Sequence, residues 1–386
     1  MSMNSRLWNT FRELAGIYSP SFGEREFCDV LSKYLKKLSS HIVEDNAGEK
    51  IGGNCGNLYC YIPGTLNGSP LLFSAHMDTV EPARGKQAVL HENGNITPAG
   101  ETILGADDIS GICIILEAIT RLREQNIPHR ALELLFPVAE EKYGAGSAVF
   151  DYSTVKAKEA YVLDLSGDIG EAANAAPSIM SFEIEVHGKA AHAGFAPKKG
   201  VSAIAVASRA VATLTREEPG PGLTFNIGRI YGGEANNIVS SLCTVSGEIR
   251  SLDHNAVLSC WEKVKAVFSA EAAAAGAIID AKCKTELKAY ETPLNSPVVR
   301  RFLRACNKTG ITPRLRSTFG GSDQNNFAMH GITGIVIACG MHEVHSPREY
   351  SNIYELENCV KLVMEIMTDQ EGVPDEDTAA IPADRV

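Results

Sequence analysis

The chain has 386 residues, of which 44% are hydrophobic and 22% are charged. This composition is ordinary for a globular protein and excludes a disordered, fibrous or membrane-embedded chain. At roughly 150 residues per domain, the length predicts two or three domains, each large enough to bury its own core. The formal net charge of −11 argues against nucleic acid and anionic membranes as partners, because both bind clustered Lys and Arg.

The ten cysteines are scattered without a Cys-x-x-Cys pair, and several lie inside apolar runs. We therefore expect reduced cysteines in the core rather than disulfides. The first residues contain no apolar signal core, and no run approaches the ~18 apolar residues of a membrane span. These features predict a cytoplasmic protein.

The first third of the chain alternates between strand-like and helix-like patterns. Ser21 and Glu24 fit a capping box, and apolar residues then recur at helical spacing from Phe27 to Leu38. The elements expected next are strands over 58–63 and 70–75, a helix over 109–119, a strand over 131–139, a helix start at 144–150 and a strand over 160–166. This alternation predicts an α/β fold with a mostly parallel sheet covered by helices. Ligands bind such sheets beyond the carboxyl ends of the strands.

The pattern changes near Pro177. Alternating strands are expected over 179–188, 223–233, 243–253 and 277–290, with helices over 201–214 and 255–275. The first pattern resumes with a helix over 298–310 and a strand over 334–340. We therefore predict an inserted α+β domain over 177–289 within a catalytic domain formed by 1–176 and 290–368. The acidic segment 369–386 is expected to be a frayed tail.

Chemically active residues follow the predicted strands. His76 and Asp78 lie two residues apart at a strand end, so both side chains point the same way, as a metal ligand and its orienting carboxylate would. Taken alone, the pair is equally a surface His beside an Asp. Asp107 and Asp108 stand where a loop enters a helix, a position in which Asp also serves as a helix cap.

Three further positions extend this set. Glu140 and Glu141 follow a buried strand, where a solvated turn is the simpler interpretation. Asp164 ends another apolar strand, where an unpaired carboxylate is costly without a cation. His345 follows the strand over 334–340. The convergence of these side chains at one sheet edge predicts a metal site, and the mixture of oxygen and imidazole ligands fits zinc, or less specifically cobalt or manganese.

Nine motifs in order make the sequence similar to a known family. They are SAHMDTV, GADDISG, VAEEKYGAGS, VLDLSG, VHGKAAHAG, GGEANNIVSS, GEIRSLD, FGGSDQNNF and EVHSPREY, and they span most of residues 10–368. The chain resembles the co-catalytic di-zinc metallopeptidases that include peptidase T, aminoacylase and small-substrate zinc carboxypeptidases. Its motifs are most similar to those of the peptidase T branch.

The resemblance implies roles for the residues at the sheet edge. Asp107 would bridge two zinc ions per chain and would be joined to Asp108 by a cis peptide. His76 and Asp164 would complete one metal site, and Glu141 and His345 would complete the other. Glu140 would be the general base that accepts a proton from the attacking water and passes it to the leaving amine. Asp78 would orient His76.

The resemblance also makes the inserted module a lid or dimerisation domain, which implies a homodimer. His192, otherwise an unremarkable exposed His, would reach the partner subunit's site and stabilise the oxyanion there. Asn236, Asn237 and Arg250 resemble substrate-binding positions, and Arg250 suits a peptide carboxylate through paired hydrogen bonds. The simpler interpretation of Arg250 is an edge-strand charge.

One segment departs from the family pattern. Phe319 stands where peptidase T has an Arg, directly before Gly320, Gly321 and Ser322, which puts strict tripeptide recognition in doubt. Gly321 and Ser322 remain candidates for substrate binding. We expect an exopeptidase that releases an N-terminal residue from short peptides. The alternatives are an N-acyl amino acid deacylase with the same metal chemistry and a metal-binding protein without catalysis.

Overall fold

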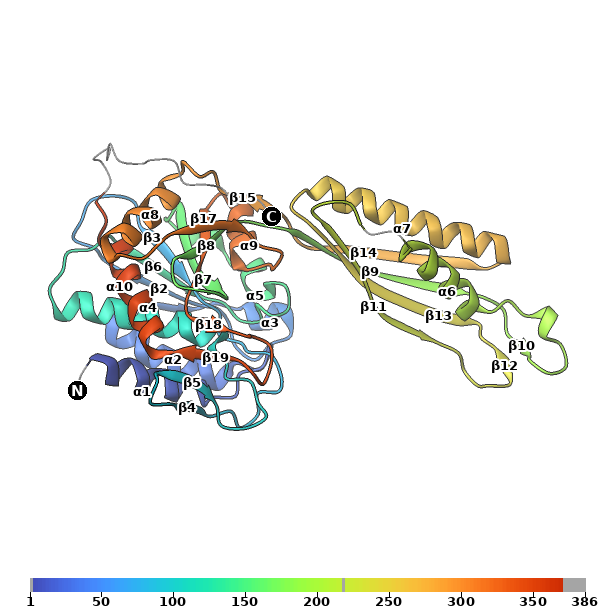
Figure 1. Ribbon diagram of the computed structural model, residues 1–386, viewed down its shortest axis with the longest axis horizontal. Coiled ribbons are helices and arrows are strands. Elements are labelled where there is room, and N and C mark those ends of the chain that lie inside the picture. Colours follow the sequence, from blue (N-terminus) through green and yellow to red (C-terminus); the bar gives the residue numbers. More distant parts are fainter. Residues whose placement is uncertain (1–2, 217–218, 371–386) are drawn as a thin grey trace. The chain divides into compact units, whose positions relative to one another are not determined.

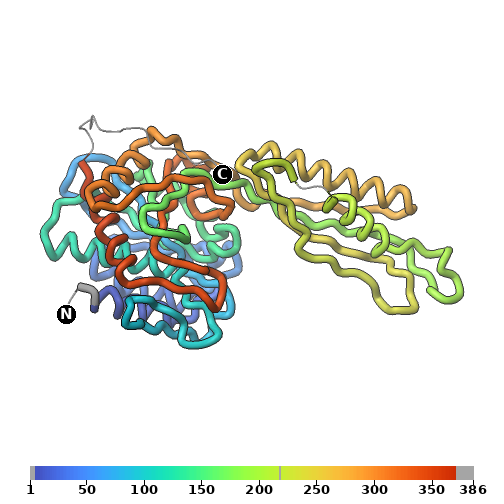
Figure 2. The backbone as a smooth tube through the Cα atoms, in the orientation of Figure 1, coloured from blue at the N-terminus to red at the C-terminus, as the bar shows by residue number. Residues whose placement is uncertain are grey.

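The computed structural model describes residues 3–216 and 219–370. The chain divides into two compact units. Unit 1 contains the described residues up to Ala175, Glu291–Thr318 and those from Ser322 onward, and unit 2 contains Ala176–Tyr290 and Phe319–Gly321. Figure 2 shows this order as a tube, in which the green and yellow stretch of chain forms unit 2 and the blue and red stretches share unit 1. The prediction of an α/β fold with an inserted α+β unit is confirmed.

Unit 1 is built on a nine-stranded sheet, counted over the described residues, with the main path β1-β2-β6-β3-β7-β17-β8-β15 and with β16 beside β8. The strands are β1 (His41–Glu44), β2 (Leu58–Ile62), β3 (Leu71–Ser74), β6 (Leu132–Phe136), β7 (Glu159–Leu165), β8 (Glu171–Ala176), β15 (Tyr290–Glu291), β16 (Arg314–Ser317) and β17 (Thr333–Ala338). The central run β6-β3-β7-β17 is parallel, whereas β1, β2 and β8 join it through antiparallel pairs. The carboxyl ends of the four central strands therefore meet at one edge.

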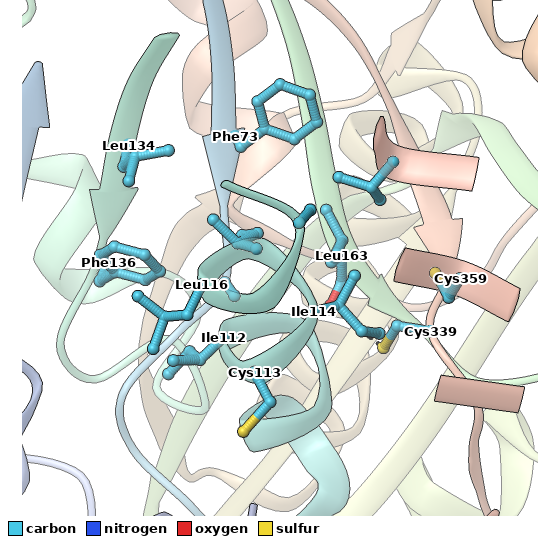
Figure 3. Close-up of a cluster of buried hydrophobic side chains, with 14 of the residues drawn as sticks. Phe73, Ile112, Cys113, Ile114, Leu116, Leu134, Phe136, Leu163, Cys339 and Cys359 are labelled. Carbon is cyan, nitrogen blue, oxygen red and sulfur yellow. Dashed lines mark hydrogen bonds between the residues drawn. The ribbon is translucent and has the colours of Figure 1, made fainter. Parts of the chain in front are cut away.

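Helices cover both faces of this sheet (Figure 1). One layer consists of α1 (Met3–Ala15), α2 (Arg25–Leu38), α4 (Ala106–Glu124), α8 (Pro297–Thr309) and α10 (Ile353–Thr368). The shorter helices are α3 (Ala47–Ile51), α5 (Ala145–Ala148), the 3₁₀ turn Tyr152–Thr154 and α9 (Asp323–Met329), of which α9 contacts β17 and β7. Alternate strand residues serve the two faces: Phe73 packs in the cluster with α4, whereas Leu72 packs in the cluster with Phe327 of α9. Figure 3 shows Ile112, Ile114 and Leu116 of α4 beside Phe73 and Leu163 of the strands.

Unit 1 also contains a small four-stranded sheet. Its strands are β4 (Ala88–Leu90), β5 (Asn95–Pro98), β18 (Met341–His342) and β19 (Tyr350–Asn352), in the order β18-β19-β5-β4. The antiparallel pair β18–β19 makes residues 343–349 a hairpin loop. This loop carries His345.

Unit 2 is a four-stranded antiparallel sheet with two helices. The strands are β9 (Ser178–His187), β11 (Leu223–Gly232), β13 (Leu242–Ser251) and β14 (Ile278–Leu287), in the order β11-β13-β9-β14. The helices α6 (Ala203–Leu214) and α7 (His254–Ala275) bury Val206, Trp261 and Phe268 in a core with the strands. A separate two-stranded sheet pairs β10 (Ala191–His192) with β12 (Ile238–Val239), and a 3₁₀ turn covers Pro197–Lys199.

Some expectations from the sequence differ from the structure. The helix start expected at 144–150 is only the four-residue α5, which ends at Ala148. Asp369, which the sequence analysis placed in the acidic tail, is buried and forms an ion pair with Arg304. The remainder of that tail, 371–386, lies outside the described residues. All ten cysteines are free thiols, as predicted. Among the described residues, no helix is both long and apolar enough to span a membrane.

Candidate metal centre

The fold brings all the predicted ligands to one edge of the central sheet. His76 and Asp78 follow β3, Glu140 and Glu141 follow β6, and Asp164 lies near the end of β7. Asp107 has non-helical backbone dihedrals at the start of α4, and its peptide bond to Asp108 is cis, as the resemblance implied. His345 reaches the same place from the β18–β19 loop. The parallel order β6-β3-β7 is what places these strand ends side by side.

Asp107 lies between the two histidines. Its Oδ1 is 3.0 Å from His76 Nε2, and its Oδ2 is 3.1 Å from His345 Nε2. His345 Nε2 is also 2.8 Å from Glu141 Oε1. On the other side, His76 Nε2 is 3.8 Å from Asp164 Oδ1. Asp107 thus lies between two sets of donor atoms, called half-sites below: His76 and Asp164 on one side, and Glu141 and His345 on the other.

Glu140 belongs to the same cluster. Its Oε2 is 4.0 Å from His76 Nε2, and the donor atoms of His76, Glu140 and Asp164 all lie within 4.8 Å of one another. The same limit holds for His76, Asp107 and Glu141. Both groups could hold a metal ion, and both contain the buried His76.

The hydrogen bonding of His76 shows that a cation fits here. Its Nδ1 lies 2.9 Å from the carbonyl oxygen of Asp78, and because a carbonyl oxygen only accepts, Nδ1 must carry the hydrogen. In the neutral ring Nε2 then presents a lone pair to Asp107, so two acceptors face each other 3.0 Å apart. Only a proton or a metal cation between them satisfies this arrangement, and fixing the tautomer through the other ring nitrogen is typical of metal-binding His.

The electrostatics of the cluster point the same way. Burial raises the pKa of Glu140 well above its usual value, and the charge of Asp164 raises it further. Burial likewise raises the pKa of Asp164, with Asp107 adding to the effect. Hydrogen bonds to Asp107 and Glu141 raise the pKa of His345 to about 10. Four carboxylates, those of Asp107, Glu140, Glu141 and Asp164, meet two histidines here, which favours bound cations.

Asp78 has a wider role than orienting His76. The contact of His76 Nδ1 with the Asp78 carbonyl oxygen, at 2.9 Å, is shorter than its 3.3 Å contact with Asp78 Oδ1. The carboxylate also accepts hydrogen bonds from the backbone N–H of Glu140 at 2.8 Å and of Glu141 at 3.2 Å, and from Ser21 Oγ at 2.7 Å. It therefore fixes the turn that carries both glutamates.

The expected capping box at the start of α2 is wrong. Ser21 Oγ donates to Asp78, and Glu24 shows no side-chain capping bond to the helix. Instead, Glu24 Oε1 accepts from Ala139 N at 2.9 Å, directly before Glu140. Burial raises the pKa of Glu24 to about 7, and the charge of Asp78 contributes. Both residues of the supposed cap thus support the candidate site, a role that their spacing alone did not indicate.

Two more acidic residues around the site were missed. Asp323, at the start of α9, is buried and accepts from Ser147 Oγ on α5, the short helix that follows Glu141. Glu349 is buried and accepts from the backbone N–H groups of the loop that ends at Asp107. Both residues stand inside quoted motifs, FGGSDQNNF and EVHSPREY, so their position was the available signal.

In unit 2, His192 and Asn237 lie together. His192 is exposed, and its Nδ1 accepts from Gly194 N at 3.1 Å and from Phe195 N at 3.2 Å, so the neutral ring carries its hydrogen on Nε2. The Asn237 carbonyl oxygen accepts from Ala193 N at 2.9 Å, which holds the His192 loop to the turn containing Asn236 and Asn237.

Arg250 lies at the other end of unit 2. It pairs with Ile179 on β9, whereas His192 follows His187 at the end of that strand. From Ile179 to His187 the strand rises by about 27 Å. The Arg250 guanidinium contacts Glu248 through Nε at 2.8 Å and the Phe319 carbonyl oxygen through Nη1 at 3.0 Å.

Gly321 and Ser322 follow Phe319. A Cβ at Gly321 would lie 2.3 Å from Leu287 Cδ1, so the backbone there packs tightly against unit 2 side chains. Ser322 N donates to Asn325 Oδ1 at 3.1 Å at the start of α9.

Known proteins resemble this chain over nearly its whole length. The aminopeptidase PepT of Bacillus cereus ATCC 10987 is 37% identical, with a TM-score of 0.87 over 95% of this chain and 98% of that chain. A tripeptidase of Staphylococcus aureus subsp. aureus Mu50 is 30% identical, with a TM-score of 0.90 over the same shares. Peptidase T of Escherichia fergusonii is 26% identical over 289 residues, which cover 70% of this chain and 67% of the relative. The chain belongs to the peptidase T family.

Two family descriptions match overlapping parts of this peptidase T family member. Residues 57–207 match "Peptidase family M28", and residues 174–275 match "Peptidase dimerisation domain". The first match contains the strands that carry His76, Glu140 and Asp164, and the second falls almost entirely in unit 2. The resemblance inferred from the sequence motifs is confirmed.

Proposed function

We propose that the protein is a metal-dependent exopeptidase that releases an N-terminal residue from short peptides. The observation that carries this proposal is the convergence of His76, Asp107 and His345, with Asp107 Oδ1 and Oδ2 each facing one imidazole Nε2 at 3.0 and 3.1 Å. Membership of the peptidase T family supports the reaction class, and the names of the PepT aminopeptidase and the tripeptidase support short peptides as substrates.

The donor set supports two zinc ions per chain. His76 and Asp164 would hold one ion, Glu141 and His345 the other, with Asp107 shared. Imidazole and carboxylate donors suit zinc, while cobalt and manganese accept the same atoms. When bound, such ions polarise the scissile carbonyl group and lower the pKa of the attacking water.

Glu140 is the proposed general base. It is buried beside His76. Its oxygen could also reach a metal ion, but the family resemblance leaves it out of the five proposed ligands and so leaves its carboxylate available to move protons. Asp78 and Glu24 hold the backbone on both sides of it, through Glu140 N and Ala139 N. In this position Glu140 accepts a proton from the attacking water and delivers it to the leaving amine.

Unit 2 contributes substrate binding and dimerisation in this proposal. The match of residues 174–275 to a peptidase dimerisation domain supports a homodimer. His192 has its hydrogen on Nε2, so it can donate to a developing oxyanion. Since unit 2 separates His192 from Arg250 by the length of β9, we propose that His192 serves the partner's site. Arg250, Asn236, Asn237, Gly321 and Ser322 remain proposed substrate-binding residues.

Arg250 already has partners in the described structure. It contacts Glu248 and the Phe319 carbonyl oxygen, so binding a peptide carboxylate would use guanidinium hydrogens beyond these contacts or replace one of them. Phe319 is exposed beside it, where peptidase T has an Arg. A broader substrate length than three residues is the expected consequence.

The proposal is tested with paired substrates. Di-, tri- and tetrapeptides with free N-termini should be hydrolysed in a zinc-dependent manner, and their N-acetylated counterparts should not. Preferential hydrolysis of N-acyl amino acids would identify a deacylase instead. Zinc binding without turnover of either set would identify a non-catalytic metal-binding protein.

A further inference from the structure

Packing alone does not fix the position of His345. Its side chain is 50% exposed, and its contacts with Asp107 and Glu141 both use Nε2. The residue lies in the β18–β19 loop with φ at 61°, and Glu343 of the same loop has φ at 47°. Since left-handed backbone is unfavourable for non-glycine residues, this loop needs an external anchor to keep one conformation.

Glu349, at the base of the same loop, supplies that anchor. It is 1% exposed, and its Oε2 accepts hydrogen bonds from Leu104 N and Gly105 N, both at 2.8 Å. Its Oε1 accepts from Asp107 N at 3.0 Å. One carboxylate therefore joins the loop that carries His345 to the backbone of Asp107 itself.

We propose that Glu349 is a positioning residue that fixes His345 and Asp107 relative to each other and so sets the metal affinity of the Glu141–His345 half-site. This inference rests on the proposed two-metal function. The other half-site depends on it less, because His76 is 1% exposed and is oriented by the carbonyl oxygen of Asp78.

The contacts of Glu349 make Glu349→Gln an informative change. Three backbone N–H groups converge on its two oxygens, whereas Gln offers one acceptor oxygen and one NH₂ group. In either orientation the NH₂ group faces at least one N–H donor, so the loop contacts cannot all survive. Lys86, also buried, loses an opposing charge, so some loss of fold stability is expected as well.

Glu133 provides a matched control for that loss of stability. It is 0% exposed on β6, and it accepts from Lys156 N at 2.9 Å, Ala157 N at 2.8 Å and Tyr59 Oη at 2.9 Å. Glu133 is the second residue of β6, and its partners Lys156 and Ala157 directly precede β7, so it lies towards the amino ends of the central strands, away from the proposed ligands. Glu133→Gln therefore disturbs a similar buried carboxylate without touching the half-sites.

The experiment measures both zinc affinities of the full chain by competition with a chelator, together with the melting temperature of the zinc-free protein. Wild type should bind two zinc ions. Glu349→Gln should weaken one of them by 10–100-fold, the range typical of residues that support metal ligands, and leave the other nearly unchanged. Glu133→Gln should lower the melting temperature but keep both affinities. Glu349→Asp, which keeps the charge on a shorter side chain, should give an intermediate affinity and remains informative if the Gln variant does not fold.

Other outcomes overturn the inference. If Glu349→Gln and Glu349→Asp bind both ions like wild type, or if Glu133→Gln weakens the same ion equally, Glu349 has no specific positioning role. A wild-type chain that binds fewer than two zinc ions instead refutes the two-metal function on which the inference rests.

Discussion

Replacing Asp78 by Asn tests whether this carboxylate fixes the turn that carries the proposed base. Oδ1 accepts from Glu140 N at 2.8 Å, and Oδ2 accepts from Ser21 Oγ at 2.7 Å and from Glu141 N at 3.2 Å. An Asn side chain has one acceptor oxygen and one NH₂ group. The better orientation turns the NH₂ group towards Ser21, whose hydroxyl can reverse and accept. Only Glu141 N is then left without an acceptor.

The size of the effect follows from that single orphaned donor. One buried N–H without a partner costs ~1–3 kcal/mol, so the free energy of unfolding of the zinc-free protein should fall by that amount in urea titration. The turn that carries Glu140 and Glu141 also loses its charged anchor. Peptide hydrolysis at saturating zinc should therefore fall by about 10–100-fold, as is typical when a partner that supports metal ligands is removed.

Ser21→Ala is the matched control, because it removes one donor and leaves the Asp78 carboxylate intact. It should lower stability while activity stays close to that of wild type. Wild-type activity and zinc affinity in Asp78→Asn would refute the reasoning. Equal losses of activity in Ser21→Ala and Asp78→Asn would also refute it, because they would show a general packing effect.

Three further predictions concern the base, the dimer and the metal. Glu140→Gln should lower kcat by about 10²–10⁴-fold with zinc content nearly intact, whereas Glu141→Gln should also lose zinc. A Glu140→Gln rate within tenfold of wild type would show that Glu140 is not the base. His192→Ala and Glu140→Gln chains, each nearly inactive alone, should regain activity when mixed, since one hybrid site combines a working Glu140 with the partner chain's His192; confirmed subunit exchange without activity would place His192 outside the partner's site. Zinc at 100 times its dissociation constant should stabilise the fold by about 2.7 kcal/mol for each occupied site, measured as a chelator-reversible rise in melting temperature, and an unchanged melting temperature would contradict a structured metal site.

The positions of the proposed ligands were predictable because they depend on local features. His76, Glu140 and Asp164 each stand at or just after an apolar run, and strand ends of a parallel sheet meet at one edge whatever the details of packing. The same reasoning located Asp107, since a loop entering a helix is visible in the sequence. Period-two geometry correctly placed His76 and Asp78 close together.

The residues that hold these ligands were not predictable, because their partners are distant in sequence. Glu349 accepts from Leu104 N, 245 residues away, and no spacing rule reports such a contact. Ser21 and Glu24 have the spacing of a capping box. In the folded chain, however, Ser21 donates to Asp78 and Glu24 accepts from Ala139 N, so neither side chain caps the helix. Tertiary contacts overrode a valid local pattern there.

The same limit applies to unit 2. His192 and Arg250 were both expected in the inserted domain, but a sequence does not reveal which end of its sheet each residue occupies. The antiparallel register puts Arg250 opposite Ile179 and leaves His192 beyond His187. Only this register shows that the two residues lie far apart within the unit.

We propose two metal half-sites joined by Asp107, one with His76 and Asp164 and the other with Glu141 and His345. The most direct test is the number of zinc ions bound per chain after reconstitution of the metal-free protein, measured by elemental analysis on wild type and Asp107→Asn. Wild type should bind two zinc ions and the variant should lose both tight sites, because each oxygen of Asp107 faces one of the two imidazoles. No more than trace zinc in wild type, or two tightly bound ions in Asp107→Asn, would contradict this proposal.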